Sequence, residues 1–363
     1  MKILVGSIPM PFNRFLVDLN AALSENNELT HDPDIFWNQE GDFDVVHLHF
    51  PEYLTFEIQE SYKTGLTDEL IEATEQRLRH WSQRSRIVVT RHVLLPHDAL
   101  HDPQWEKMYE IFYRYAHGVV HFAQASIDEF EQRYQDTDFV YGPPQHVIVP
   151  HHNYGSLPNH ISRSEARKKL GIADDRKVML VFGSIRNREE TNLICNAFKT
   201  LKLKNKLLLV SKWREELADV SWIRLKYWIR DAKRLFYKLH PSYRFNYDFV
   251  EEEDTQLYLN AADVLFIPRL KVLNSGNITL GMTYGLPVVG PNSWDVGELL
   301  TETGNSVFDP EHPHTASEAV KEAFHLAEVG EIGKANQKLA ESQWSPSQCG
   351  ESYIELFRRV SAT

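Results

Sequence analysis

Cysteine is nearly absent from this sequence, since Cys195 and Cys349 are the only two among its 363 residues. This scarcity excludes a disulfide-rich scaffold and fits a protein that folds in a reducing compartment. Long apolar runs are also missing, because no stretch approaches the roughly 20 residues that a transmembrane helix needs. The opening MKILVGSIPMP is too short and too soon interrupted by proline for a signal peptide. We therefore expect a cytoplasmic protein.

An excess of positive charge is missing as well. Lysine and arginine number 39 against 51 aspartate and glutamate residues, a net charge of −12, which argues against a nucleic-acid partner. No G-x-G-x-x-G follows the first apolar run, so a nicotinamide dehydrogenase is disfavoured. What is present is ordinary for a globular protein, with 42% hydrophobic and 25% charged residues, and the length suffices for two domains with sizeable cores.

Apolar, strand-like runs alternate with helical patterns along the whole chain. We expect strands at 2–7, 44–50, 86–93, 118–122 and 146–151, then at 177–184, 206–211, 263–268, 286–291 and 305–309. Helical patterns lie between them at 67–83, 124–134, 188–201 and 315–329. This alternation predicts parallel sheets that are covered on both faces. Because 152–165 is polar and rich in turn residues, we predict an α/β fold with two doubly wound, Rossmann-like domains, 1–155 and 160–342.

Polar residues follow several of these strands. They occur in the segments HLHFPE, RHVLLPHD, FGSIRNREE and IPRLKVLNSGN. Ligands of open parallel sheets bind beyond the carboxyl ends of the strands. The sequence therefore predicts a site in a cleft that both domains line.

The segment VLNSGNITLGMTYGLPVVGP, residues 272–291, interrupts an apolar run with Ser275, Gly276 and Asn277. Ser275 and Asn277 are good N-cap residue types, so we expect a buried helix over 278–284 and a strand at Val288–Val289. A helix N-terminus offers unpaired N–H groups to an anion such as phosphate. The alternative interpretation is an ordinary cap in an α/β domain.

Six blocks, in this order, resemble the nucleotide-sugar-dependent GT-B glycosyltransferases that include bacterial polysaccharide-assembly enzymes. The blocks are DVVHLHFPE, TRHVLLPHD, VIVPHHNYG, ARKKLGIADDRKVMLVFGSIR, NAADVLFIPR and LNSGNITLGMTYGLPVVGP. The resemblance implies an acceptor-binding N-terminal domain and a donor-binding C-terminal domain. It also implies that the final helix, within 345–363, returns to the N-terminal domain.

The resemblance also implies roles for residues of the donor domain. Ser275, Gly276 and Asn277 would hold the donor diphosphate at a helix N-terminus, and Arg186 would contact the same diphosphate. A guanidinium group can bind phosphate in a bidentate manner. The alternative for Arg186 is an ordinary surface arginine. Basic residues and the helix end would then stabilise the leaving group, so we expect no metal and no cofactor besides the sugar nucleotide.

Two departures from the family pattern concern the donor site. Glu189 stands where many relatives have a lysine, and Arg188, Arg269 or Lys271 could replace that charge. Val272 and Leu280 stand where many relatives have glutamates. These departures leave the donor-sugar contacts open, as well as the choice between retaining and inverting transfer.

Candidate residues for chemistry follow the third predicted strand. Relatives usually place a histidine at the position of His92 against the donor sugar. An inverting enzyme needs a base, for which His97 and Asp98 are the candidates, since a histidine or carboxylate can accept a proton. In a retaining enzyme these residues would mainly position sugars. The alternative is that 96–98 forms only a polar turn.

Further imidazoles suit contacts with the acceptor. His47 and His49 alternate on one strand face, and we predict acceptor contacts from His49, Glu52 and His151, or core hydrogen bonds from the same groups. A zinc site is disfavoured because no cysteine accompanies these histidines.

The segment 221–240 is basic in an otherwise acidic chain. A helix here would have Arg and Lys on one face and Leu, Ile and Trp on the other. One interpretation is packing on its own domain, and the other is peripheral contact with an anionic membrane that carries lipid-linked acceptors.

Together these features predict a hexosyltransferase that uses a nucleotide sugar and a glycan or lipid-linked acceptor in surface-polysaccharide synthesis. Two alternatives remain within the fold: a sugar-nucleotide epimerase, and an inactive protein that binds a sugar nucleotide or glycan. Consumption of a sugar nucleotide without an acceptor would indicate the epimerase. Binding without turnover would indicate the inactive protein.

Overall fold

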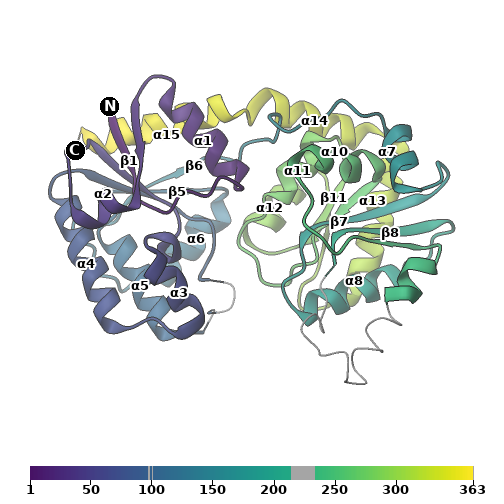
Figure 1. The fold of residues 1–363 in the computed structure, drawn as a ribbon, viewed down its shortest axis with the longest axis horizontal. Helices are drawn as coiled ribbons and strands as arrows, with labels where there is room; N and C mark the ends of the chain where they lie inside the picture. Colours follow the sequence, from purple (N-terminus) through teal and green to yellow (C-terminus); the bar gives the residue numbers. More distant parts are fainter. Residues whose placement is uncertain (97–98, 100, 214–233, 363) are drawn as a thin grey trace. The chain divides into compact units, whose positions relative to one another are not determined.

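The computed structural model describes residues 1–96, 99, 101–213 and 234–362. The chain divides into two compact units. Unit 1 comprises Met1–His152, Val272–Asn274 and Trp344–Thr363, and unit 2 comprises Asn153–Lys271 and Ser275–Gln343. Each unit contains a six-stranded parallel sheet covered by helices (Figure 1). The predicted α/β class with two doubly wound sheets is thereby confirmed.

The sheet of unit 1 has the strand order β2-β1-β3-β4-β5-β6. The strands are β1 (Lys2–Val5), β2 (Glu28–His31), β3 (Val45–Leu48), β4 (Arg86–Thr90), β5 (Gly118–His121) and β6 (Gln145–Ile148). Successive side chains point to opposite faces, so Val45 and Val46 enter two different hydrophobic clusters. Both faces are therefore buried, which explains why the central strands are apolar throughout.

Helices cover both faces of this sheet. On one face lie α1 (Arg14–Ser24) and α15 (Pro346–Ser361), which supply Leu19 and Phe357 to one cluster. On the other lie α2 (Pro33–Asn38), α3 (Phe56–Thr64), α4 (Asp68–Ser82), α5 (Pro103–Arg114) and α6 (Gln124–Arg133). The last helix of the chain thus belongs to unit 1.

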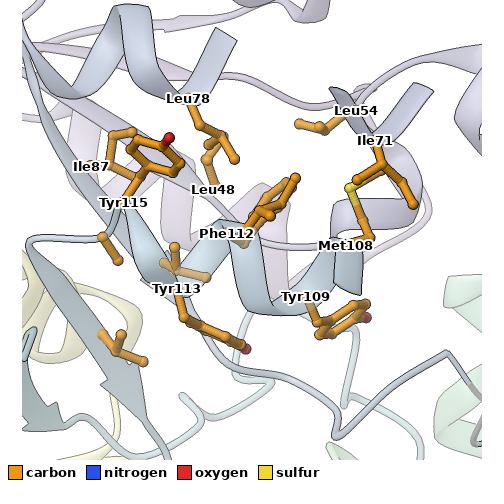
Figure 2. Packing of buried hydrophobic residues seen from close by; sticks show 14 of the residues in the cluster. Leu48, Leu54, Ile71, Leu78, Ile87, Met108, Tyr109, Phe112, Tyr113 and Tyr115 are labelled. Carbon is orange, nitrogen blue, oxygen red and sulfur yellow. The ribbon is translucent and has the colours of Figure 1, made fainter. Parts of the chain in front are cut away.

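The core between α4, α5 and the sheet is tightly packed, as Figure 2 shows for Phe112 with Leu48, Ile71 and Leu78. Burial of one such side chain stabilises a fold by about 1.5–3 kcal/mol. Local signals set the start of α5, because Asp102 accepts the N–H of Gln104 at 2.9 Å and Pro103 occupies the first turn. The packing fixes Tyr109 of α5, which is only 2% exposed.

The sheet of unit 2 has the order β12-β11-β10-β7-β8-β9. Its strands are β7 (Lys177–Ser184), β8 (Lys206–Lys212), β9 (Tyr243–Phe245), β10 (Val264–Phe266), β11 (Val288–Pro291) and β12 (Ser306–Phe308). The cluster on one face includes residues of α8 (Arg188–Thr200) and α13 (Ala316–Val329). Outside this cluster, α10 (Glu252–Ala261) contacts β7 and α11 (Asn277–Thr283) contacts β11. Against these pack α7 (Arg163–Leu170) and α14 (Glu331–Gln343), while α12 (Trp294–Glu302) follows β11.

Ten predicted strands correspond to strands of the structure, whereas β2 and β9 are absent from the prediction. Both are edge strands of three or four residues and contain no fully buried side chain. Neither therefore shows the apolar run that marks the central strands.

The basic segment 221–240 lies mostly outside the described residues, which resume at 234. Residues 234–239 are helical and expose Leu235, Phe236 and Leu239. None of the described helices has both the length and the apolar character to cross a membrane.

Candidate functional site

The carboxyl end of β7 opens the candidate site of unit 2. Gly183 has φ +89°, a conformation that glycine adopts readily, and the pairing with β8 changes register between Val181 and Ser184. The N–H of Gly183 donates to Ser211 Oγ at 2.8 Å. This bulge ends regular pairing and leads the chain into the turn that carries Arg186.

The turn after β7 ends where α8 begins. Asn187 caps the helix by accepting the N–H of Glu190 at 2.9 Å, and the N–H of Arg186 donates to the Glu190 carboxylate at 2.7 Å. The side chains of Arg186 and Arg188 are exposed. The structure thus places both predicted donor ligands at the carboxyl edge of the sheet.

Arg269 follows β10, the strand next to β7. It forms an ion pair with Glu190 and donates to the carbonyl of Ser184 at 2.9 Å. Burial lowers the pKa of Arg269, whose side chain is 11% exposed, and Glu190 opposes this shift. Much of the Arg269 charge is therefore balanced within the protein. Lys271, two residues farther on, is exposed.

The Ser275–Asn277 turn precedes α11, which runs from Asn277 to Thr283. Gly276, with φ −59°, is the N-cap, and no side chain caps the helix, so the expected capping by Ser275 or Asn277 is wrong. Asn277 instead donates from Nδ2 to the carbonyl of Phe182 at 2.9 Å, because its side chain reaches the end of β7. Gly285, with φ +68°, follows the end of the helix in a conformation that is typical of a C-terminal cap.

The corresponding edge of unit 1 is crowded with imidazoles. His47 and His49 share a strand face, and their ring centroids lie 4.2 Å apart. His47 Nε2 is 2.8 Å from Thr90 Oγ1, whereas His49 Nδ1 is 3.0 Å from His92 Nε2. Burial lowers the pKa of His47 to about 3, and it also lowers the pKa of His49 and of His92 well below the usual range. These three rings are therefore neutral at neutral pH.

Aromatic side chains fix the orientation of His92. Its ring stacks on Phe50 with centroids 4.2 Å apart and meets Phe15 edge-on at 5.3 Å. A neutral imidazole can both donate and accept a hydrogen bond. Nε2 of His49 is buried and has no hydrogen-bond partner within the described part of the chain. This edge therefore suits an uncharged, hydrogen-bonding ligand.

His151 and His152 follow β6 and complete this cluster. The His151 ring lies 4.4 Å from that of Phe15, and His152 Nε2 is 2.9 Å from the Phe15 carbonyl oxygen. Burial lowers the pKa of His151 to about 3. His152 thus connects the end of β6 to α1, while His151 joins the neutral imidazoles.

Glu52 lies in the one-turn helix η1 (Pro51–Tyr53) that follows β3. The hydroxyl of Tyr109 donates to Glu52 Oε2 at 2.9 Å, and burial raises the pKa of Glu52. A cavity of about 820 Å³ opens beside Glu52. It is lined by Glu52, Tyr53, Gln59, Glu60, Tyr62, Lys63 and Thr64.

Two predicted candidates, His97 and Asp98, lie outside the described residues. Among the residues that are described, no group of three or more His, Cys, Asp and Glu side chains is arranged to hold a metal ion. Sequence reasoning missed the pairing of Glu190 with Arg269 and the cavity along α3. The polar face of α3, directly after a strand-end carboxylate, was the available signal for this cavity.

No protein-family model and no curated protein sequence matches this chain. Solved structures do resemble it over nearly its full length. Sucrose-phosphate synthase from Thermosynechococcus elongatus is 12% identical, with a TM-score of 0.70 and 99% of each chain covered. HepE from Anabaena, solved with UDP-glucose, is 12% identical, with a TM-score of 0.69 and 100% of each chain covered.

A glycosyltransferase from Rickettsia africae is also similar, with 12% identity, a TM-score of 0.65, and coverage of 99% of this chain and 98% of that chain. Identities this low establish the fold alone. The chain has the GT-B fold, and the fold implied by the sequence resemblance is confirmed.

Proposed function

We propose that this GT-B chain is a glycosyltransferase that moves a hexose from a nucleotide-diphosphate sugar to a glycan or lipid-linked acceptor in surface-polysaccharide synthesis. The observation that carries the proposal is the cationic edge of unit 2. There, the loops after the adjacent strands β7 and β10 hold Arg186 and Arg269 where ligands of such sheets bind. The likeness to HepE, solved with UDP-glucose and with UDP, supports a nucleotide sugar as donor.

The cationic edge suits the leaving group of glycosyl transfer, because negative charge grows on the diphosphate as the glycosidic bond breaks. The exposed side chain of Arg186 binds the diphosphate in this proposal, and Arg188 and Lys271 add positive charge. Arg269 shapes the loop and adds a charge that Glu190 partly balances. Backbone N–H groups of the Ser275–Asn277 turn supply further donors. These groups take the place of a divalent metal, so transfer should persist in EDTA.

The edge of unit 1 suits sugar hydroxyls. His92 acts as a hydrogen-bonding ligand of a sugar because its low pKa makes it a weak base. His49, Glu52 and His151 bind the acceptor in this proposal. His97 and Asp98 stay predictions for proton transfer.

Replacement of Arg186 by alanine tests the donor site. We expect the affinity for the nucleotide sugar to fall by about 1.5–3 kcal/mol, the scale of a hydrogen bond to a charged group. Calorimetric titration with UDP- and GDP-hexoses measures this change, and an unchanged melting temperature shows that the fold persists. Lys202→Ala, an exposed cation between α8 and β8, is the matched control and should bind like the parent. Unchanged donor affinity in Arg186→Ala would remove the residue from the site.

One observation favours a second function, that of an inactive protein that binds a sugar nucleotide. The Glu190–Arg269 ion pair consumes positive charge at the donor edge, and Val272 and Leu280 replace the glutamates of many relatives. Donor binding with neither transfer nor hydrolysis would favour this function over the enzyme.

Peripheral membrane contact remains part of the proposal. The helical residues 234–239 expose Leu235, Phe236 and Leu239 beside the cations Arg234 and Lys238. Apolar and cationic side chains together favour an anionic bilayer surface. Sedimentation with phosphatidylglycerol vesicles should capture the full chain, whereas phosphatidylcholine vesicles should not. Equal recovery from both would contradict an anionic membrane partner.

A further inference from the structure

The cavity beside Glu52 has the size and the chemistry of a saccharide site. Its volume of about 820 Å³ lies within the range of about 300–1,000 Å³ that small-molecule sites occupy. Two tyrosine rings offer apolar surface for the face of a pyranose. The amide of Gln59, the hydroxyl of Thr64 and the charged groups of Glu60 and Lys63 offer hydrogen bonds to sugar hydroxyls.

The local backbone brings Glu52 to this cavity. Pro51 starts a one-turn helix directly after β3, and the N–H of Tyr53 donates to the carbonyl of Phe50 at 3.0 Å. Glu52 therefore lies at the carboxyl end of a central strand. The hydroxyl of Tyr109 holds one of its two carboxylate oxygens. Because Tyr109 belongs to the packed core of α5, its hydroxyl is a rigid anchor for the carboxylate (Figure 2).

Among the described residues, no cationic side chain balances this carboxylate. Within the described ranges, no lysine, arginine or histidine forms an ion pair with Glu52. A charge removed from water without such a partner is costly, and a bound proton relieves that cost. In agreement with this argument, burial raises the pKa of Glu52, which makes its carboxylate a better proton acceptor.

The nearby imidazoles are poorer proton acceptors. Burial lowers the pKa of His49 and of His92 well below the usual range, so neither ring readily takes a proton at neutral pH. Of the described groups at this edge of unit 1, Glu52 combines an anchored carboxylate with a ligand-sized cavity.

We propose that the cavity beside Glu52 binds the saccharide acceptor and that the Glu52 carboxylate accepts the proton of the attacking hydroxyl. This proposal rests on the proposed glycosyltransferase function. The acceptor oxygen forms a bond to the anomeric carbon while the bond from that carbon to the donor phosphate oxygen breaks. The electron pair of the broken bond leaves with the diphosphate, and the hydroxyl proton passes to Glu52. Such a single displacement inverts the anomeric configuration.

The first test compares Glu52→Gln with Glu57→Gln in the full chain. Glu57 is an exposed carboxylate on α3 outside the cavity lining, so its replacement should leave transfer unchanged. Transfer from UDP- or GDP-hexoses to octyl hexosides is followed, together with donor affinity and the anomeric configuration of the product. Glu52→Gln should lower kcat at least about 100-fold, the usual contribution of a general base, with donor affinity retained. The product of the parent chain should be inverted.

The second test uses Tyr109→Phe and can be carried out even if Glu52→Gln folds poorly. The hydrogen bond from Tyr109 lowers the pKa of Glu52, so its loss should raise that pKa further. A base must be deprotonated to act, and the acidic limb of the kcat/KM profile should therefore move to higher pH. Burial raises the pKa of Tyr53, Tyr109 and Tyr113, so these phenols stay neutral over this range. Tyr62 also lines the cavity. Among the described residues that line the cavity, Glu60 and Lys63 carry the other charged groups.

The outcomes separate this proposal from the function on which it rests. Parent-like transfer by Glu52→Gln, a product with retained configuration, or an unmoved acidic limb in Tyr109→Phe would each overturn the role of Glu52 alone. A parent chain that binds donors but neither transfers to a hexoside nor hydrolyses the donor would overturn the proposed function as well.

Discussion

The two units have similar parallel sheets, but the carboxyl edges of these sheets carry different kinds of side chain. In unit 1, the strand ends carry imidazoles that burial keeps neutral, with phenylalanine rings between them. In unit 2, the strand ends carry guanidinium groups, a buried carboxylate and a bulged turn. The strand order around each edge is similar, so topology does not determine which ligand is preferred.

The difference suits the two edges to different chemical groups of a ligand. Neutral donors and acceptors can bind sugar hydroxyls without the cost of burying a charge. Guanidinium groups bind phosphate more strongly because both partners are charged. The proposed nucleotide-sugar substrate contains both kinds of group, a sugar and a diphosphate.

Acidification should lower the stability of the fold because the imidazoles of unit 1 are buried in neutral form. This is the largest effect that we expect. The pKa of His47 and of His151 is about 3 in the folded chain, against about 6.5 in an unfolded chain. Because the unfolded chain then binds more protons, stability is present above pH 6.5 and is lost as the pH falls towards 3. At pH 5 the loss should be about 2 kcal/mol for each histidine, or about 4 kcal/mol together.

Urea unfolding of the full chain at pH 8 and pH 5 measures this loss. A His47→Gln, His151→Gln double variant is the control, and its stability should change less between the two pH values. An equal pH dependence in parent and variant would show that these imidazoles are not held neutral, and the contrast between the edges would fail.

Removal of the Glu190 carboxylate should break the balance of charge in unit 2. In Glu190→Ala, Arg269 keeps a largely buried charge without its ion-pair partner, and the N–H of Arg186 loses its acceptor. We expect a loss of about 3 kcal/mol in the free energy of unfolding, the scale of a broken buried pair. A Glu190→Leu, Arg269→Met double variant should recover most of the loss. A single variant as stable as the parent would show that Arg269 is hydrated at this edge.

The fold was predictable from sequence wherever burial was complete. Central strands such as β3 and β4 are largely apolar because helices cover both faces of the sheet. This apolar pattern can be recognised in the amino-acid sequence alone. The edge strands β2 and β9 were not predicted because backbone pairing with a neighbour defines them more than their side chains do. Edge pairing depends on the rest of the sheet, so a local pattern does not encode it.

The site was predictable only as far as the strand-end rule reaches. That rule places Arg186 and His92 at the carboxyl edges, where the structure has them. It does not pair Glu190 with Arg269, or Glu52 with Tyr109, because tertiary packing brings together residues far apart in the chain. The low pKa values of the histidines likewise come from burial, which residue identity alone does not fix.

The smallest expected effect concerns the backbone at Gly276 and separates a cap from a ligand contact. Gly276 has φ −59°, which any L-residue adopts, so Gly276→Ala should cost less than about 1 kcal/mol of stability. If the N–H groups of this turn bind the donor diphosphate, a new methyl group hinders the close approach of phosphate. The donor dissociation constant should then rise about fivefold, equivalent to about 1 kcal/mol, while the melting temperature of the ligand-free protein falls only slightly. Ser275→Ala keeps the backbone N–H groups and separates a hydroxyl contact from a backbone contact. Parent-like donor binding and transfer in well-folded Gly276→Ala would make the turn a structural cap and leave donor binding to the arginines.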